Sequence, residues 1–197
     1  MIQTIIFDVG EVLLGYRWED MLTDHGVPRE KAILIGNTMF ADSLWEELDL
    51  GCRPFEEIVQ EYRRKYPEYR EEITWFLNHG EYMHVPREDV WEKVHGLKQK
   101  GYGIYLLSNY SENLFHKHTK NSAFMKDIDG MVVSYQIHKT KPDPAIYLHL
   151  LQTYHLQPET CLFFDDRPAN TEAAKKLGIQ TITVTSKELL MGELEKL

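Results

Sequence analysis

The sequence predicts an α/β fold, in which a parallel sheet is covered by helices on both faces and interrupted by one all-helical insertion. Short apolar and β-branched segments alternate with amphipathic segments along residues 86–197, a pattern typical of parallel strands joined by helices. Residues 16–85 have helical periodicity and almost no strand signal. With 197 residues, 43% of them hydrophobic, the chain is long enough for one core and an inserted subdomain.

The first predicted strand covers residues 2–7 and ends at Asp8. The segment after residue 15 then changes to helical spacing, with Pro54 at a plausible helix start. The clearest helical segments in this insertion are residues 28–40, 54–66 and 69–79. We therefore expect a core made of residues 1–15 and 86–197, and a helical cap made of residues 16–85.

Strand and helix alternate through the rest of the chain. Strands are expected at residues 102–109, 130–137, 160–166 and 180–185. Helices are expected at residues 88–101, 112–120, 144–155, 168–178 and 186–197. Gly101 and Gly178 suit helix ends, Pro144 suits a helix start, and Ser186 is a candidate N-cap.

Composition narrows the possible partners and the compartment. The net charge is 22 − 31 = −9, which disfavours binding to nucleic acid or to an anionic membrane surface. Two cysteines, Cys52 and Cys161, are too few for a disulfide framework or a cysteine-based zinc site. The N-terminus does not resemble a signal peptide, and no segment has the roughly 20 apolar residues of a membrane helix. We expect a cytoplasmic protein.

Polar residues follow the predicted strands where ligands bind in parallel sheets. Asp8 follows the first strand, Ser108 and Asn109 end the second, and Asp165 and Asp166 end a later one. A nearby loop, "KTKPDP", adds Lys139 and Lys141. Each residue alone is more typical of a cap or a solvated surface.

Together, however, these residues indicate a specific chemistry. Three carboxylates at one edge repel each other unless a cation neutralises them. Oxygen ligands favour a hard ion such as Mg²⁺, and a lysine beside a hydroxyl suits a phosphoryl group.

The ordered motifs "FDVGEVLL", "LLSN", "KPDPAIY" and "FFDDRPAN" resemble those of the haloacid dehalogenase-like (HAD) superfamily. More narrowly, they are similar to the branch that contains α-D-glucose-1-phosphate phosphatase and the N-terminal phosphatase domain of soluble epoxide hydrolases. The resemblance covers the Rossmann-like core at residues 1–15 and 86–190. It implies that residues 16–85 form a type-1 cap, which would restrict the substrate to a small phosphorylated metabolite.

The resemblance also implies a role for each motif residue. Asp8 would be the nucleophile that forms an aspartyl-phosphate. Mg²⁺ would be bound by Asp8, the backbone carbonyl of Gly10 and Asp166, with Asp165 acting through water.

The resemblance further implies that Ser108 and Lys141 act in catalysis and in binding the phosphoryl group. Backbone N–H groups after the nucleophile and around Asn109 would complete its binding site.

One position departs from the usual pattern of these phosphatases, Asp-x-Asp. Gly10 stands where the second aspartate would protonate the leaving group. General acid–base catalysis is typically worth about 10²–10⁴ in rate. Either another group substitutes, with Glu11, His79 or His84 as candidates, or the enzyme is slow and favours aryl or anomeric phosphates over alkyl phosphates.

Three functions therefore remain open. The sequence favours a Mg²⁺-dependent phosphatase. A haloacid dehalogenase-type hydrolase of carbon–halogen bonds is the second, but Asp165 and Asp166 would repel a carboxylate substrate without a cation. Val9-Gly10 also lacks the tyrosine-glycine pair expected after a dehalogenase nucleophile. The third is a catalytically weak phosphate-binding relic, suggested only by Gly10.

Overall fold

The computed structural model describes residues 1–197 and contains a five-stranded parallel sheet. Its strands are β1 (Thr4–Phe7), β4 (Gly103–Ser108), β5 (Gly130–Val133), β6 (Cys161–Asp165) and β7 (Gln180–Thr183). They lie in the order β5-β4-β1-β6-β7, so that β1 is central. The predicted α/β fold is confirmed.

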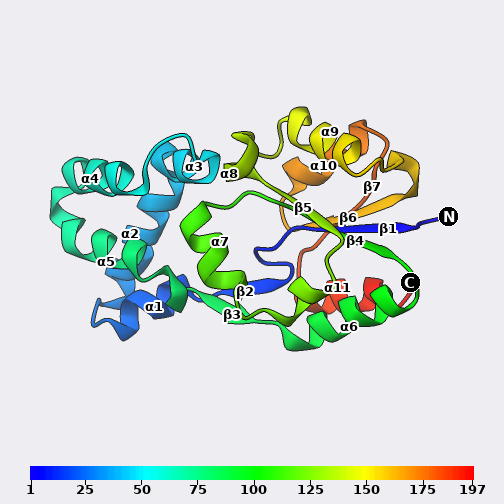
Figure 1. Cartoon of the computed structure of the whole chain (residues 1–197). Helices are drawn as coiled ribbons and strands as arrows, with labels where there is room; N and C mark the ends of the chain where they lie inside the picture. The colour runs from blue at the N-terminus through cyan, green and yellow to red at the C-terminus, as the bar shows by residue number, and fades with distance from the viewer.

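Helices cover both faces of the sheet (Figure 1). One face carries α9 (Pro144–Thr153) and α10 (Pro168–Lys176), and the other carries α6 (Glu88–Gln99) and α11 (Lys187–Leu194). Ile5 and Phe7 of β1 pack in a cluster with α6 and α11, whereas Ile6 packs with α9 and α10. Burial on both faces explains why this strand is continuously apolar.

The strand register positions the polar residues seen in the sequence. Phe7 lies opposite Leu106 of β4 and Phe164 of β6. The residues that follow these positions, Asp8 and Asp165 among them, therefore emerge at the same edge. This edge is the topological switch point, because the chain connects from β1 to one neighbour and later returns to the other.

Between β1 and α6 the chain forms five helices, which we call the cap. They are α1 (Trp18–Asp24), α2 (Arg29–Ala41), α3 (Ser43–Leu50), α4 (Phe55–Lys65) and α5 (Arg70–Asn78), with short 3₁₀ turns at Pro67–Tyr69 and Gly80–Tyr82. The cap has its own apolar cluster, in which Ile35, Tyr62 and Ile73 are completely buried. In Figure 1 it lies at one end of the molecule, and both chain termini lie at the other.

A short antiparallel ribbon joins the cap to the sheet domain. Its strands are β2 (Leu14–Tyr16) and β3 (His84–Pro86), which pair with Gly15 opposite Val85. The ribbon spans both of the boundaries predicted from the sequence. No helix of the structure combines the length and the apolar character needed to cross a membrane.

The segment at residues 130–137 differs from its predicted structure. Only Gly130–Val133 is a strand, and Ser134–Ile137 forms a short helix, α8. The Ser134 hydroxyl accepts a hydrogen bond from the N–H of Tyr110 (2.9 Å) and donates one to the carbonyl of Asp49 (2.6 Å). These contacts turn the chain away from the sheet, and a local apolar pattern does not reveal them. The remaining elements are α7 (Glu112–Thr119) and the 3₁₀ turns Ala123–Lys126 and Pro158–Thr160.

Candidate active site

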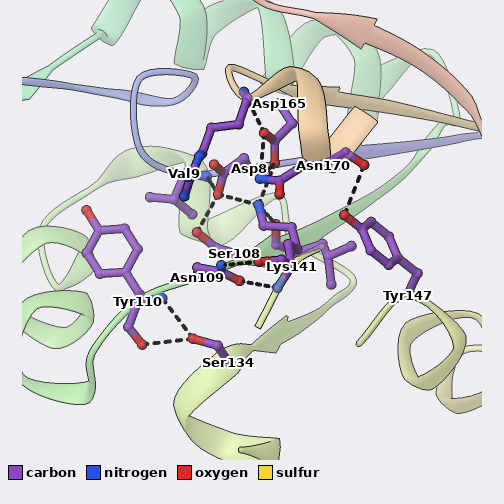
Figure 2. A network of polar contacts seen from close by, with 12 residues as sticks. Asp8, Val9, Ser108, Asn109, Tyr110, Ser134, Lys141, Tyr147, Asp165 and Asn170 are labelled. Carbon is purple, nitrogen blue, oxygen red and sulfur yellow. Dashed lines mark hydrogen bonds and ion pairs between the residues drawn. The ribbon is translucent and has the colours of Figure 1, made fainter. Parts of the chain in front are cut away.

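Asp8 is the focus of the polar network at the edge of the sheet (Figure 2). The residue is only 8% exposed, and one carboxylate oxygen, Oδ1, has three donors within hydrogen-bond distance. They are the Ser108 hydroxyl (2.5 Å), the Val9 N–H (2.7 Å) and the Lys141 ammonium (3.0 Å). These contacts leave the other oxygen, Oδ2, without a protein donor.

Lys141 supplies the buried positive charge of the site. Its Nζ donates to Asp165 Oδ2 (2.6 Å) and to the carbonyl of Leu107 (2.8 Å). The Asn109 amide holds the Lys141 backbone from both sides, with its Oδ1 accepting at 2.7 Å and its Nδ2 donating at 2.9 Å. Burial disfavours the charged ammonium and so lowers the pKa of Lys141. The negative charges of Asp8 and Asp165 outweigh this effect, and the net result is a raised pKa.

The two consecutive acids at the end of β6 have different environments. Asp165 is fully buried, and its oxygens accept from Lys141, from the Arg167 N–H (2.8 Å) and from Asn170 Nδ2 (2.9 Å). Asp166 has no protein partner and faces the cavity described below. Burial, with the charges of Asp8 and Asp165, raises the pKa of Asp166 to about 7.

The three carboxylates form a group that can hold a metal ion. One oxygen from each of Asp8, Asp165 and Asp166 lies within 4.8 Å of the others. The sequence predicted that these acids converge, and the family resemblance implied that Asp166 is the more direct ligand. The saturated hydrogen bonding of Asp165 supports that order, while the role of each residue stays a prediction.

A cavity of about 320 Å³ lies above this group, between the sheet and the cap. Its lining includes four carboxylates, from Asp8, Glu11, Asp49 and Asp166, but only two cations, from Lys141 and Arg167. The excess of negative charge suits a bound divalent cation, whose own charge would bring the site closer to neutrality. The four carboxylates offer oxygen atoms, which are the ligands that Mg²⁺ prefers.

The cap provides the apolar wall of the cavity. Trp18, Phe40, Trp45 and Met83 line it, and Phe40 packs edge-on against Trp45 with ring centroids 4.6 Å apart. Trp45 belongs to α3 of the cap. It packs against the apolar cluster of the cap and also faces the cavity.

Gly10 has no room for a side chain. A Cβ built on it would lie 2.4 Å from the Tyr16 hydroxyl and 3.0 Å from the ring. Tyr16, which no motif in the sequence marks, therefore occupies the space that a side chain at position 10 would need.

The Tyr16 hydroxyl is the first member of a buried hydrogen-bond chain. It lies 2.7 Å from the Tyr110 hydroxyl, which lies 2.8 Å from Nδ1 of His118, and His118 Nε2 lies 2.7 Å from the carbonyl of Gly80. Because a carbonyl only accepts, Nε2 carries a proton. Burial lowers the pKa of His118 to about 4, so the neutral ring accepts from Tyr110 at Nδ1. The Tyr110 hydroxyl in turn accepts a hydrogen bond from the Tyr16 hydroxyl. The Tyr16 proton is therefore held in this bond and does not point at the reaction centre.

The three acid–base candidates named from the sequence either have hydrogen-bond or ion-pair partners of their own or lie outside the cavity. Glu11 pairs with Arg87 (2.6 Å) and accepts from the Tyr16 N–H (3.0 Å). His79 Nδ1 lies 2.9 Å from the Trp75 carbonyl, and neither His79 nor His84 lines the cavity. The structure does not support any of the three as the substitute for a side chain at position 10.

Replacing Gly10 with alanine should destabilise the protein by about 1–3 kcal/mol, because the new methyl group overlaps Tyr16. Combining it with Tyr16→Phe should recover part of the loss, since the closest overlap is with the hydroxyl. Urea denaturation of the four proteins in this cycle measures the coupling. Gly96→Ala is the control, because a Cβ there meets nothing within 4 Å. Additive effects of the two changes would contradict the steric explanation.

Comparison with known proteins identifies the class to which this site belongs. A family model for haloacid dehalogenase-like hydrolases matches residues 2–178, and the chain belongs to this family. The resemblance seen in the four sequence motifs is thereby confirmed.

Individual relatives and solved structures agree with this family. The enolase-phosphatase E1 of Persephonella marina is 31% identical over 106 residues, which are 51% of this chain and 45% of that protein. The bifunctional epoxide hydrolase 2 of Mus musculus is 31% identical over 104 residues, 51% of this chain and 19% of that protein. The chain thus covers less than half of either relative.

A similar fold occurs in a variant of a HAD family enzyme from Bacteroides thetaiotaomicron, solved with magnesium and inorganic phosphate. The TM-score is 0.74 at 20% identity, over 95% of this chain and 96% of that chain. This likeness is one of fold, and it agrees with the family model and the enolase-phosphatase relative, by which the protein is a HAD-like hydrolase with phosphatase relatives.

Proposed function

We propose that this hydrolase is a Mg²⁺-dependent phosphatase of small phosphorylated metabolites, acting through an aspartyl-phosphate on Asp8. The observation that carries this proposal is the pairing of a buried carboxylate with a lysine 3.0 Å away, beside the unpartnered Asp166. Such an arrangement offers a nucleophile, a phosphate counter-charge and a metal ligand in one place.

In the first step, an oxygen of Asp8 attacks phosphorus and the bond to the leaving group breaks. In the second, water attacks the same phosphorus and restores the carboxylate. Oδ2 is the better placed attacking atom, since Oδ1 already accepts three hydrogen bonds. Mg²⁺, held by Asp8, Asp166 and the carbonyl of Gly10, would neutralise the charge that the carboxylate and the phosphate bring together.

Lys141 and Ser108 have a second task in this proposal. Both donate to Asp8, and a lysine and a hydroxyl in this position can also hold the phosphoryl oxygens of a substrate. Asn109, predicted to bind substrate, uses its amide to fix the Lys141 backbone. Its contribution through the side chain is therefore to position that lysine.

The size of the cavity supports a small substrate. A volume of about 320 Å³ is near the lower end of the roughly 300–1,000 Å³ typical of small-molecule sites. The cap wall would exclude bulk water from the reaction. Arg167, exposed at the rim and without an ion-pair partner, adds a positive charge for an anionic substrate.

The dehalogenase alternative has less support from the same residues. It would use Asp8 on carbon and would need no metal. The cavity already contains more carboxylates than cations, which disfavours a halogenated acid as substrate. The relic alternative rested on the glycine at position 10 alone. Tyr16 fills the space beside it, so packing gives a second reason for a glycine there.

The test is a screen of phosphorylated metabolites and an aryl phosphate for phosphate release. We expect release with Mg²⁺ and none with EDTA, and restoration when excess Mg²⁺ follows EDTA. Halide release from a 2-haloacid without metal would support the dehalogenase instead. Phosphate binding without any turnover would support the relic.

A further inference from the structure

The cavity contains one carboxylate that neither the fold nor the proposed chemistry yet employs. Its acidic residues are Asp8, Glu11, Asp49 and Asp166. Asp8 and Asp166 are assigned above, and Glu11 is paired with Arg87. Like Asp166, Asp49 has no hydrogen-bond or ion-pair partner on its side chain, and unlike Asp166 it has no role in the chemistry proposed above.

Asp49 belongs to the last turn of α3 in the cap, yet it faces the nucleophile's cavity. Two contacts fix this helix end to α8 and to His138, the residue that follows α8. The carbonyl of Asp49 accepts from the Ser134 hydroxyl at 2.6 Å, and the carbonyl of Leu50 lies 2.8 Å from His138 Nδ1. Gly51 ends the helix in the left-handed conformation, so close to Tyr135 that a Cβ would lie 2.8 Å from that side chain.

These backbone contacts fix the end of α3 beside the cavity, and the Asp49 side chain lines the same cavity as Asp8 without a partner of its own. The same Ser134 hydroxyl accepts from the N–H of Tyr110, so the cap, α8 and the loop after β4 are joined at one atom. A proton-transfer group needs a defined position and an unoccupied carboxyl, and Asp49 has both.

The charges facing Asp49 favour a protonated carboxyl near neutral pH. Burial, followed by the carboxylates of Asp8 and Glu46, raises the pKa of Asp49 to about 7, although Lys141 and Arg167 oppose the rise. Tyr16 and Tyr110 also face this region, and burial keeps the pKa of each well above 10. They stay neutral over the range in which Asp49 titrates.

We propose that Asp49 is the general acid and base of this enzyme, supplying from the cap the function that Gly10 lacks. The inference rests on the proposed phosphatase function. In the first step the Asp49 carboxyl gives its proton to the leaving alkoxide as the phosphorus–oxygen bond breaks. In the second, the Asp49 carboxylate takes a proton from the attacking water as the bond between phosphorus and Asp8 breaks, which regenerates both side chains and releases phosphate.

The test compares full-length wild type with Asp49→Asn on phosphate esters of increasing leaving-group pKa, from p-nitrophenyl phosphate to an alkyl phosphate. Leaving groups that are already stable anions need no proton. We therefore expect Asp49→Asn to keep the initial burst of p-nitrophenol within about tenfold of wild type, and to lose about 10²–10⁴ in rate with the alkyl phosphate. Its steady-state rate after the burst should fall as well, because the second step needs the base.

The pH profile gives a readout that a structural role would not move. In wild type, the first step with a poor leaving group should slow as the pH rises and Asp49 ionises. The variant should lose this dependence. Glu56→Gln is the matched control, because Glu56 is an exposed cap carboxylate outside the cavity, and it should behave as wild type.

The possible outcomes distinguish a failure of the role of Asp49 from a failure of the phosphatase function. An active wild type with the same leaving-group dependence in Asp49→Asn would overturn the role of Asp49 and leave the phosphatase intact. A wild type that releases no phosphate from any ester would overturn both. Melting curves of Asp49→Asn establish that any lost activity is not lost folding.

Discussion

Asp8→Asn is expected to lower Mg²⁺-dependent phosphate release by a factor on the order of 10⁴–10⁶, the scale of losing a nucleophile that acts in concert with its neighbours. Asparagine has nearly the same shape but cannot form the acyl phosphate. Lys141 keeps its ion pair with Asp165, 2.6 Å away, so the fold should survive. Initial rates with the best substrate of the screen measure the effect.

The matched control for this change is Asp20→Asn, at an aspartate of the cap whose side chain is 56% exposed. It should keep full activity. Circular dichroism should show the same fold for wild type, Asp8→Asn and Asp20→Asn. Retention of more than about a tenth of the activity by Asp8→Asn would exclude Asp8 as the nucleophile.

Lys141→Met is expected to destabilise the protein by about 3–5 kcal/mol at neutral pH, because it leaves the buried carboxylates of Asp8 and Asp165 without their cation. Activity should disappear with it. Urea denaturation measures the stability loss. Lys139→Met, two residues away at an exposed position without an ion pair, is the control and should change stability by less than about 0.5 kcal/mol.

The stability loss of Lys141→Met should depend on pH. Burial already raises the pKa of Asp8 above its ordinary value of 3.8, with Lys141 opposing the rise, so removing the lysine raises it further. A carboxyl whose pKa is raised by folding binds more protons in the folded state, and stability then falls as pH increases above the unfolded pKa. The difference from wild type should therefore be smallest near pH 4 and largest at neutral pH. A pH-independent difference would argue against an unpaired buried carboxylate.

Much of the fold could be predicted because local pattern and tertiary environment agree. β1 is apolar at every position because helices cover both faces of the sheet, and Gly101 and Gly178 follow helix ends with positive φ. The short helix α8 was missed because contacts between Ser134 and residues 24 and 85 positions away determine it. Such contacts have no signature in the neighbouring residues.

The same distinction applies to the candidate site. Asp8, Ser108, Lys141 and the β6 acids could be located because strand ends in a parallel sheet converge at one edge. Asp49 and Tyr16 could not, because their place depends on how the cap and the β2–β3 ribbon fold back over that edge. The sequence did mark the gap at Gly10, which indicated that either another residue substitutes there or the enzyme is slow.

Chemical trapping of the covalent intermediate tests the central claim most directly. Enzyme, Mg²⁺ and p-nitrophenyl phosphate are mixed, quenched during the burst and reduced with borohydride, which converts an aspartyl-phosphate to homoserine. Peptide mass spectrometry should then find homoserine at position 8 in proportion to the burst, and none when EDTA is present. A burst of equal size with an unmodified Asp8, or with the modification at another carboxylate, would contradict the account.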